Sequence, residues 1–178
     1  MRAVAQRYIE LTPQGAAICV GGPANDVRGR LLQALLLREP HRPWQSEELV
    51  QMLPNEPEKA PRALFHLQRE GCIAVSLSAP IADERSWPAI QGDLASFVEE
   101  GATLAALLDA DGLVIAQADA ARLNDDPLAA PLAADLTIHV GDGLLATTYG
   151  LALRGLHAPD SSSLVPLVRH LARTRSPH

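Results

Sequence analysis

The sequence predicts an α+β protein in two parts, from three observations. Apolar residues recur at helical spacing in some segments and at strand spacing in others. A polar, proline-containing stretch at residues 80–88 separates two segments that each hold enough apolar residues for a small core. The charge also changes, because residues 1–80 carry nine basic and eight acidic side chains whereas residues 81–178 carry six and thirteen. We expect a domain at 1–79, a linker at 80–88 and a second domain at 89–178.

The first twenty residues predict a β-hairpin. Residues 3–11 mix apolar and polar positions at roughly strand period, and residues 16–20 are apolar again. Between them, Thr12-Pro13-Gln14-Gly15 has the composition of a turn. Cys19 and Cys72 are the only thiols, and each is flanked by apolar residues in a predicted strand. We therefore expect both cysteines to be buried and not to form a disulfide.

Three helices and a strand are predicted next. Each helix begins with residues that cap or start helices, such as Asp26, Ser46 and Pro57. Gly71 ends the third helix, and the β-branched run CIAVSLS after it predicts a strand. The expected helices span about residues 26–39, 46–53 and 57–70.

The second part predicts an antiparallel sheet with flanking helices. A short amphipathic helix is expected at 89–100, and two apolar strands follow, joined by the turn sequence Asp-Ala-Asp-Gly at 109–112. Residues 119–135 favour helix but are divided by two prolines. Two or three more strands are expected between 136 and 157, and a last helix follows the serines at 161–163.

A basic stripe on the third helix is the candidate binding site of the first part. Its members are three, four and three residues apart, so they share one side of a helix while the apolar residues of that helix face a core. Basic side chains can neutralise DNA phosphates, and arginine can also contact guanine; the alternative is an ordinary solvated helix face. The candidate DNA-binding residues are Lys59, Arg62, His66 and Arg69.

Residues 1–79 resemble a winged helix of the response-regulator output type. The resemblance depends on RLLQALLLREP, SEELVQMLP, EKAPRALFHLQREG and CIAVSLS, in the order helix, helix, helix, strand, after the upstream hairpin. It implies a DNA-binding or protein-binding module.

Residues 89–175 resemble, less specifically, the roadblock/LC7 family. The resemblance depends on a helix before the hairpin ALLDADGLVIAQ, further strands, and the closing helix SSLVPLVRHLART. It implies a domain without catalytic residues that dimerises by joining sheets and binds partners such as small GTPases. The apolar hairpin would equally suit a GAF- or PAS-like sensor domain.

The other polar residues do not predict an enzyme. The spacing of His139, Asp142, His157 and Asp160 matches no metal-ligand signature. The paired aspartates at 109 and 111 are explained by a turn, the serines at 161–163 by helix capping, and a glycine-rich phosphate loop is absent from the sequence. We expect no catalytic residue, no metal and no cofactor.

The sequence thus predicts a non-enzymatic regulatory protein, a homodimer through its C-terminal domain, whose winged helix binds double-stranded DNA. The alternative is a protein-protein adaptor, in which the winged helix binds a protein and the acidic domain binds a small GTPase or another basic partner. Only 3% of the residues are aromatic, which argues against single-strand nucleic-acid binding. With no signal peptide or membrane span apparent, a cytoplasmic protein that does not bind membranes is expected.

Overall fold

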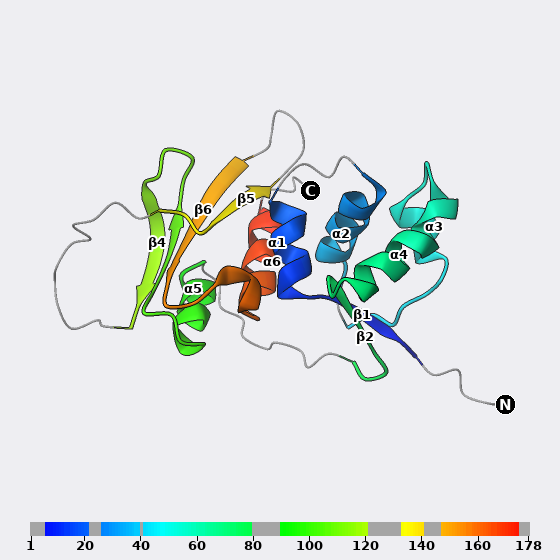
Figure 1. Cartoon of the computed structure of the whole chain (residues 1–178), viewed down its shortest axis with the longest axis horizontal. Coiled ribbons are helices and arrows are strands. Elements are labelled where there is room, and N and C mark those ends of the chain that lie inside the picture. Colours follow the sequence, from blue (N-terminus) through cyan, green and yellow to red (C-terminus); the bar gives the residue numbers. More distant parts are fainter. Residues whose placement is uncertain are drawn as a thin grey trace.

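Helices and antiparallel strands make up the fold, which confirms the α+β class (Figure 1). The computed structural model describes residues 6–21, 26–39, 41–79, 90–120, 133–140 and 147–174. Within these residues there is a two-stranded sheet, β1-β2, and a four-stranded sheet in the order β4-β3-β6-β5. No helix in these ranges is long and apolar enough to cross a membrane.

The predicted N-terminal β-hairpin is wrong. Strand β1 (Tyr8–Leu11) pairs antiparallel with β2 (Ile73–Ser76), which follows it by some sixty residues, with Tyr8 opposite Ser76 and Leu11 opposite Ile73. The second predicted strand is instead helix α1 (Pro13–Val20). The strand predicted at CIAVSLS is therefore present as β2, but its observed partner is the chain's N-terminal strand.

Helix α1 forms because Thr12-Pro13 starts a helix as readily as it starts a turn. The Thr12 hydroxyl accepts a hydrogen bond from the Gly15 amide at 3.1 Å, and Pro13 occupies the first helical position. Of the five residues from Ala16 to Val20, Ala16, Cys19 and Val20 are buried and Ile18 is exposed. That spacing is helical, and it places Cys19 in a helix where a strand was predicted.

The three predicted helices of the first part are confirmed with shorter bounds. They are α2 (Val27–Leu37), α3 (Glu48–Met52) and α4 (Ala60–Arg69), with a 3-10 turn, η1 (Pro57–Lys59), before α4. Asp26 caps α2 by accepting from the Gly29 amide at 2.7 Å. Gly71 follows α4 with a φ of 74°, the left-handed conformation that glycine adopts without strain.

The four-stranded sheet contains the predicted hairpin. Strands β3 (Leu104–Leu108) and β4 (Val114–Asp119) pair antiparallel, and the Asp109 carboxylate accepts hydrogen bonds from the turn amides of Asp111 and Leu113. Strand β5 (Leu136–Val140) pairs with β6 (Thr147–Arg154), which runs unbroken through Gly150 and pairs with β3 on its other side. The helical prediction for 119–135 falls largely outside the described residues.

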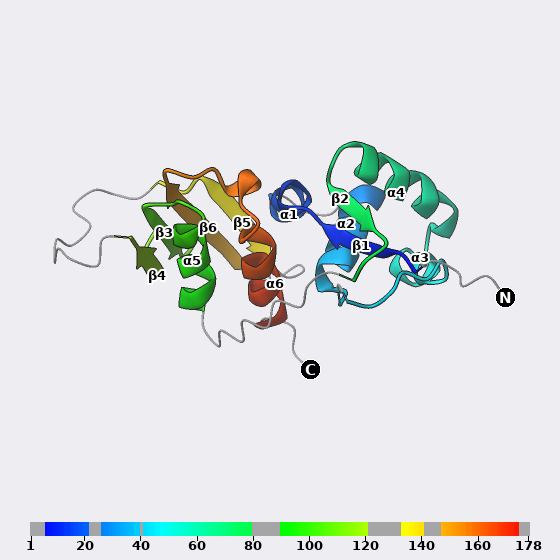
Figure 2. The ribbon, with the colours of Figure 1, turned by 90° about the horizontal axis from the view of Figure 1, so that it is seen from below.

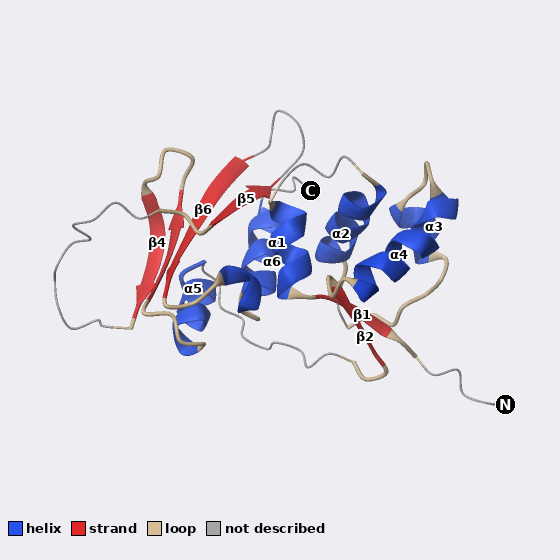
Figure 3. Ribbon diagram, viewed as in Figure 1, coloured by secondary structure: helices blue, strands red, loops and turns tan. Residues whose placement is uncertain are grey.

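Three helices cover one face of this sheet (Figures 2 and 3). Two of them, α5 (Ile90–Glu99) and α6 (Leu164–Thr174), were predicted in this part of the chain. The third is α1, which contacts α6, β5 and the 3-10 turn η3 (Ala158–Asp160). A helix from the N-terminal part therefore packs on the C-terminal sheet.

One apolar core joins the two parts of the chain. Its buried members include Leu31 and Leu67 from the first part and Phe97, Leu151 and Leu167 from the second. A polar contact accompanies it, since Nε of Arg169 on α6 donates to the Leu36 carbonyl oxygen at the end of α2 at 2.9 Å. The predicted linker at 80–88 lies outside the described residues, and the division into two domains stays a prediction.

Candidate nucleic-acid interface

Helix α4 presents one face to the core and the opposite face to solvent. Ala60, Ala63 and Leu67 are buried and Leu64 packs partly against the core, as the sequence predicts. Inside the protein α4 packs chiefly on α2. Figure 2 shows α4 beside the two-stranded sheet, in the half of the molecule opposite to the four-stranded sheet. The outer face is exposed and consists of Pro61, Arg62, Phe65, Gln68 and Arg69.

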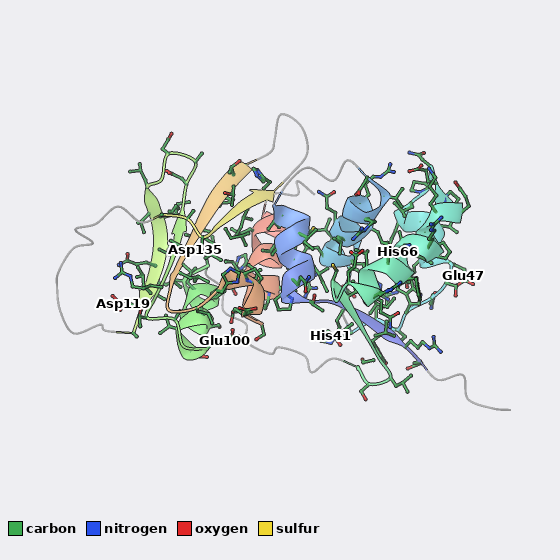
Figure 4. All side chains as sticks on the ribbon, viewed as in Figure 1. His41, Glu47, His66, Glu100, Asp119 and Asp135 are labelled. Atoms are coloured by element: carbon green, nitrogen blue, oxygen red, sulfur yellow. The ribbon has the colours of Figure 1, made fainter. Side chains whose placement is uncertain are left out.

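The structure brings together only part of the predicted basic stripe. Arg62 and Arg69 are exposed, and neither has an ion-pair or hydrogen-bond partner among the described side chains. His66 is half-buried beside this face, where Figure 4 labels it on α4. Lys59 lies in η1, before the α-helix begins, and forms an ion pair with Glu56. The free positive charge on α4 therefore belongs to the two arginines.

Two acidic residues that flank α4 are neutralised by neighbouring cations. Glu56, before the helix, pairs with Arg30 as well as with Lys59, and Glu70, after the helix, pairs with Arg28. Arg28 and Arg30 both come from α2, the helix on which α4 packs. The electrostatic repulsion that Glu56 and Glu70 would exert on a phosphate is therefore reduced.

The pKa values of the Glu56–Lys59 pair reflect this contact. The hydrogen bond from Lys59 is the largest cause that lowers the pKa of the Glu56 carboxyl, and the same bond raises the pKa of the Lys59 ammonium. Both groups are therefore charged at neutral pH. A lysine held this way must give up its carboxylate partner before it contacts a phosphate, which makes it a poorer phosphate ligand than Arg62 or Arg69.

The sequence interpretation missed Phe65 and Gln68. Phe65 has 61% of its surface exposed, which is unusual for a large aromatic side chain, and its ring lies edge-on to His66 with centroids 6.0 Å apart. Gln68 is exposed one turn later. The three-residue spacing from Arg62 to Phe65 to Gln68 predicts a shared helix face, so the signal was present in the sequence.

The remaining polar clusters serve the fold. Arg38 is buried against Glu48, with Nε 2.6 Å from Oε2, and its guanidinium also donates to the carbonyl oxygens of Glu39, Arg42 and Pro43. Trp44 lies 5.4 Å from this guanidinium and packs on the core. These contacts fix the connection between α2 and α3, and they leave Arg38 without a free donor face for a ligand.

The serines at 161–163 bind a carboxylate. All three hydroxyls donate to Glu100, which follows α5, with the bond from Ser163 at 2.9 Å. Burial raises the pKa of Glu100, but the hydrogen bonds from the serines outweigh it and hold the pKa below its ordinary value. The cluster connects the end of α5 to the start of α6, and its hydroxyls already have an acceptor.

The other candidate residues do not converge. His157 and Asp160 are both strongly exposed, with Nδ1 and Oδ2 3.6 Å apart, and His139 lies on β5 near the Thr148 hydroxyl. Asp142 lies outside the described residues. Cys19 and Cys72 are buried and unbonded, as the sequence predicts, and burial raises the pKa of Cys19 to about 12. In the ranges that the structure describes, no three histidine, cysteine or acidic side chains form a group suited to a metal ion.

Comparisons with known proteins give no relative. No family model, no curated protein and no solved structure matches this chain.

Proposed function

We propose that the protein is a non-enzymatic regulator that binds double-stranded DNA through the outer face of α4 and acts as a homodimer through its C-terminal sheet. The helix order α2, α3, α4 followed by strand β2 is the order expected of a winged helix, in which the third helix enters the major groove. The dimer would present two such helices to two half-sites.

The observation that carries this proposal is a pair of arginines on one exposed helix face that have no ion-pair or hydrogen-bond partner among the described residues. Arg62 and Arg69 are seven residues apart, which is two helical turns or about 10 Å. Ion pairs to α2 and η1 offset two of the acidic residues near α4, Glu56 and Glu70. An arginine that keeps its donors free near neutralised carboxylates is well placed to donate hydrogen bonds to a phosphate or a guanine.

The first test compares substitutions on α4 with a matched one elsewhere. Binding of genomic DNA fragments to the full chain is measured by fluorescence anisotropy over a range of salt concentrations. Arg62→Ala and Arg69→Ala should each weaken binding by roughly tenfold at 0.1 M salt and lower the salt slope by about one. Lys59→Ala should cost less because its charge already neutralises Glu56.

The control is Arg154→Ala, which removes an equally exposed arginine from β6 in the other part of the chain. It should leave both affinity and salt slope unchanged. Equal affinity in wild type and in the Arg62→Ala/Arg69→Ala double variant would rule out α4 as the DNA-binding element.

The homodimer proposal is supported by edge strand β4. Among the described strands it has a sheet neighbour on one side only. Leu113 directly before it and Val114 and Ile115 at its start are 65%, 44% and 49% exposed. Exposed apolar residues on an edge strand favour pairing with another strand.

Light scattering of the full chain should give twice the 19.0 kDa chain mass, and Ile115→Lys should shift the population toward monomer. A wild-type chain that stays monomeric at high concentration would exclude the dimer.

A protein-protein adaptor is the second candidate, and the acidity around β4 favours it. Asp111 lies in the turn before the strand, and Asp119 is its last residue, labelled in Figure 4. A basic partner would be attracted to this edge, whereas a second acidic copy would be repelled. The salt dependence therefore distinguishes the homodimer from the adaptor. Dimerisation should strengthen as the salt concentration rises, whereas binding of a basic peptide should weaken.

A further inference from the structure

The outer face of α4 carries more than positive charge. Phe65 lies at its centre, with Arg62 one turn before it, and Gln68 and Arg69 about one turn after it. If the two arginines contacted only phosphates, they would give DNA affinity without regard to sequence, because phosphate contacts carry no sequence information. Phe65 and Gln68 are instead the kinds of side chain that contact base edges in the major groove.

The exposed ring of Phe65 needs an apolar contact. At 61% exposure it leaves most of the ring in water, although Ala63 and Leu67 beside it are buried. In the major groove the one apolar group on a base edge is the C5-methyl of thymine, and phenylalanine is among the residues that pack on it. The flanking arginines favour polyanionic DNA as the source of that contact over an apolar protein surface.

Gln68 lies one turn further along the same face. Glutamine can donate to N7 and accept from the N6 amino group of adenine in a bidentate pair. Three residues of α-helix rise about 4.5 Å, against about 3.4 Å between successive base pairs. Phe65 and Gln68 can therefore face the same base pair or adjacent ones, with Arg62 beyond them.

We propose that α4 selects a DNA site containing an A·T pair, with Phe65 on the thymine methyl group and Gln68 on an adenine. Arg62 and Arg69 then hold the helix in the groove through phosphate or guanine contacts. The inference rests on the proposed DNA binding and adds the chemical class of site that the protein recognises.

In the first step of the test, the full chain is mixed with a pool of random DNA duplexes, and the duplexes that it binds are selected and sequenced. The selected duplexes are remade with deoxyuridine in place of thymidine, which removes only the methyl group. Wild type should bind the uracil duplexes about fourfold more weakly, the effect of one buried methyl. Phe65→Ala should bind both forms alike. Gln68→Ala should keep the methyl effect but lose roughly tenfold in affinity for the selected site over random DNA.

The outcomes are distinguishable. Equal binding of thymine and uracil duplexes by wild type, or a methyl effect that survives in Phe65→Ala, would overturn the inference while DNA binding stands. Absence of binding to any duplex would overturn both proposals, and Phe65 would then be an anchor for a protein. Because Phe65 is exposed, Phe65→Ala should fold, and Phe65→Leu serves as the second variant, with a reduced but measurable methyl effect.

Discussion

At the scale of single residues, Gly15 allows a close approach between α1 and the backbone just before β2. This glycine lies inside α1, and a Cβ added there would overlap the carbonyl oxygen of Cys72 and lie 2.9 Å from its carbonyl carbon. Next to it, the Thr12 amide donates to the same Cys72 oxygen at 3.1 Å, so the backbone has little freedom to move away. The two segments pack so closely because position 15 has no side chain.

Gly15→Ala should therefore destabilise the protein despite the higher helix propensity of alanine. Propensity alone would stabilise by up to about 1 kcal/mol, but the overlap with backbone should cost about 3 kcal/mol or more. Urea unfolding followed by circular dichroism measures the free energy of unfolding. Gln14→Ala is the control, since Gln14 is exposed in the same helix. A Gly15→Ala variant as stable as wild type would show that α1 does not pack on Cys72 in this way.

Glu100 makes stability depend on pH. Its pKa is lowered in the folded protein by the serine hydroxyls that bind the carboxylate, although burial opposes this. The stabilisation is thus fully present above the ordinary value of 4.5, and it is lost as the pH falls through the lowered pKa.

Glu100→Gln should lower the free energy of unfolding at pH 7 by about 1 kcal/mol, because it replaces charged acceptors by a weaker one. Between pH 7 and pH 3 the variant should lose less stability than wild type does. Urea unfolding at several pH values measures this, with Asp111→Asn as a variant that removes an exposed carboxylate elsewhere. Parallel curves for wild type and Glu100→Gln would contradict the assignment.

At the scale of elements, local signals predicted α2, α4 and the β3–β4 hairpin, but not helix α1 or the pairing of β1. Caps and stops such as Asp26 and Gly71 act within a few residues, so α2, α4 and the hairpin of β3 and β4 followed from the sequence. The partner of β1 did not, because β2 lies more than sixty residues away and no local rule selects it. Thr12-Pro13 is ambiguous between turn and helix, and the segment 16–20 buries Ala16, Cys19 and Val20 at helical spacing as α1.

The candidate site shows the same division. Spacing placed Arg62, His66 and Arg69 on one helix, and the structure confirms that two of them are exposed. Spacing alone could not decide whether Lys59 joins the stripe or forms the i,i+3 ion pair with Glu56 that the structure shows. Nor could it show that Arg28 and Arg30 of α2 neutralise the acidic residues around α4, since those ion pairs cross between helices.

At the scale of the whole molecule, α1 connects the two parts of the chain. It contacts α2 of the first part and α6, η3 and β5 of the second, and Arg169 adds a hydrogen bond from α6 to the end of α2. Burial lowers the pKa of Arg169, as expected for a guanidinium enclosed at this contact. A fragment that begins at residue 89 would lack α1, so part of one face of its four-stranded sheet would be uncovered.

The two parts should therefore unfold together. Leu151→Ala removes a fully buried side chain from β6. The change should lower the free energy of unfolding by about 3 kcal/mol. It should also reduce the hydrogen-exchange protection of amides in α4 as much as in β6. Leu77→Ala, at an exposed position just after β2, should change neither. Native-state exchange with mass spectrometry measures both regions in one experiment. If Leu151→Ala lowers protection in β6 while α4 keeps its wild-type protection, the parts unfold independently, and the core between them contributes little to stability.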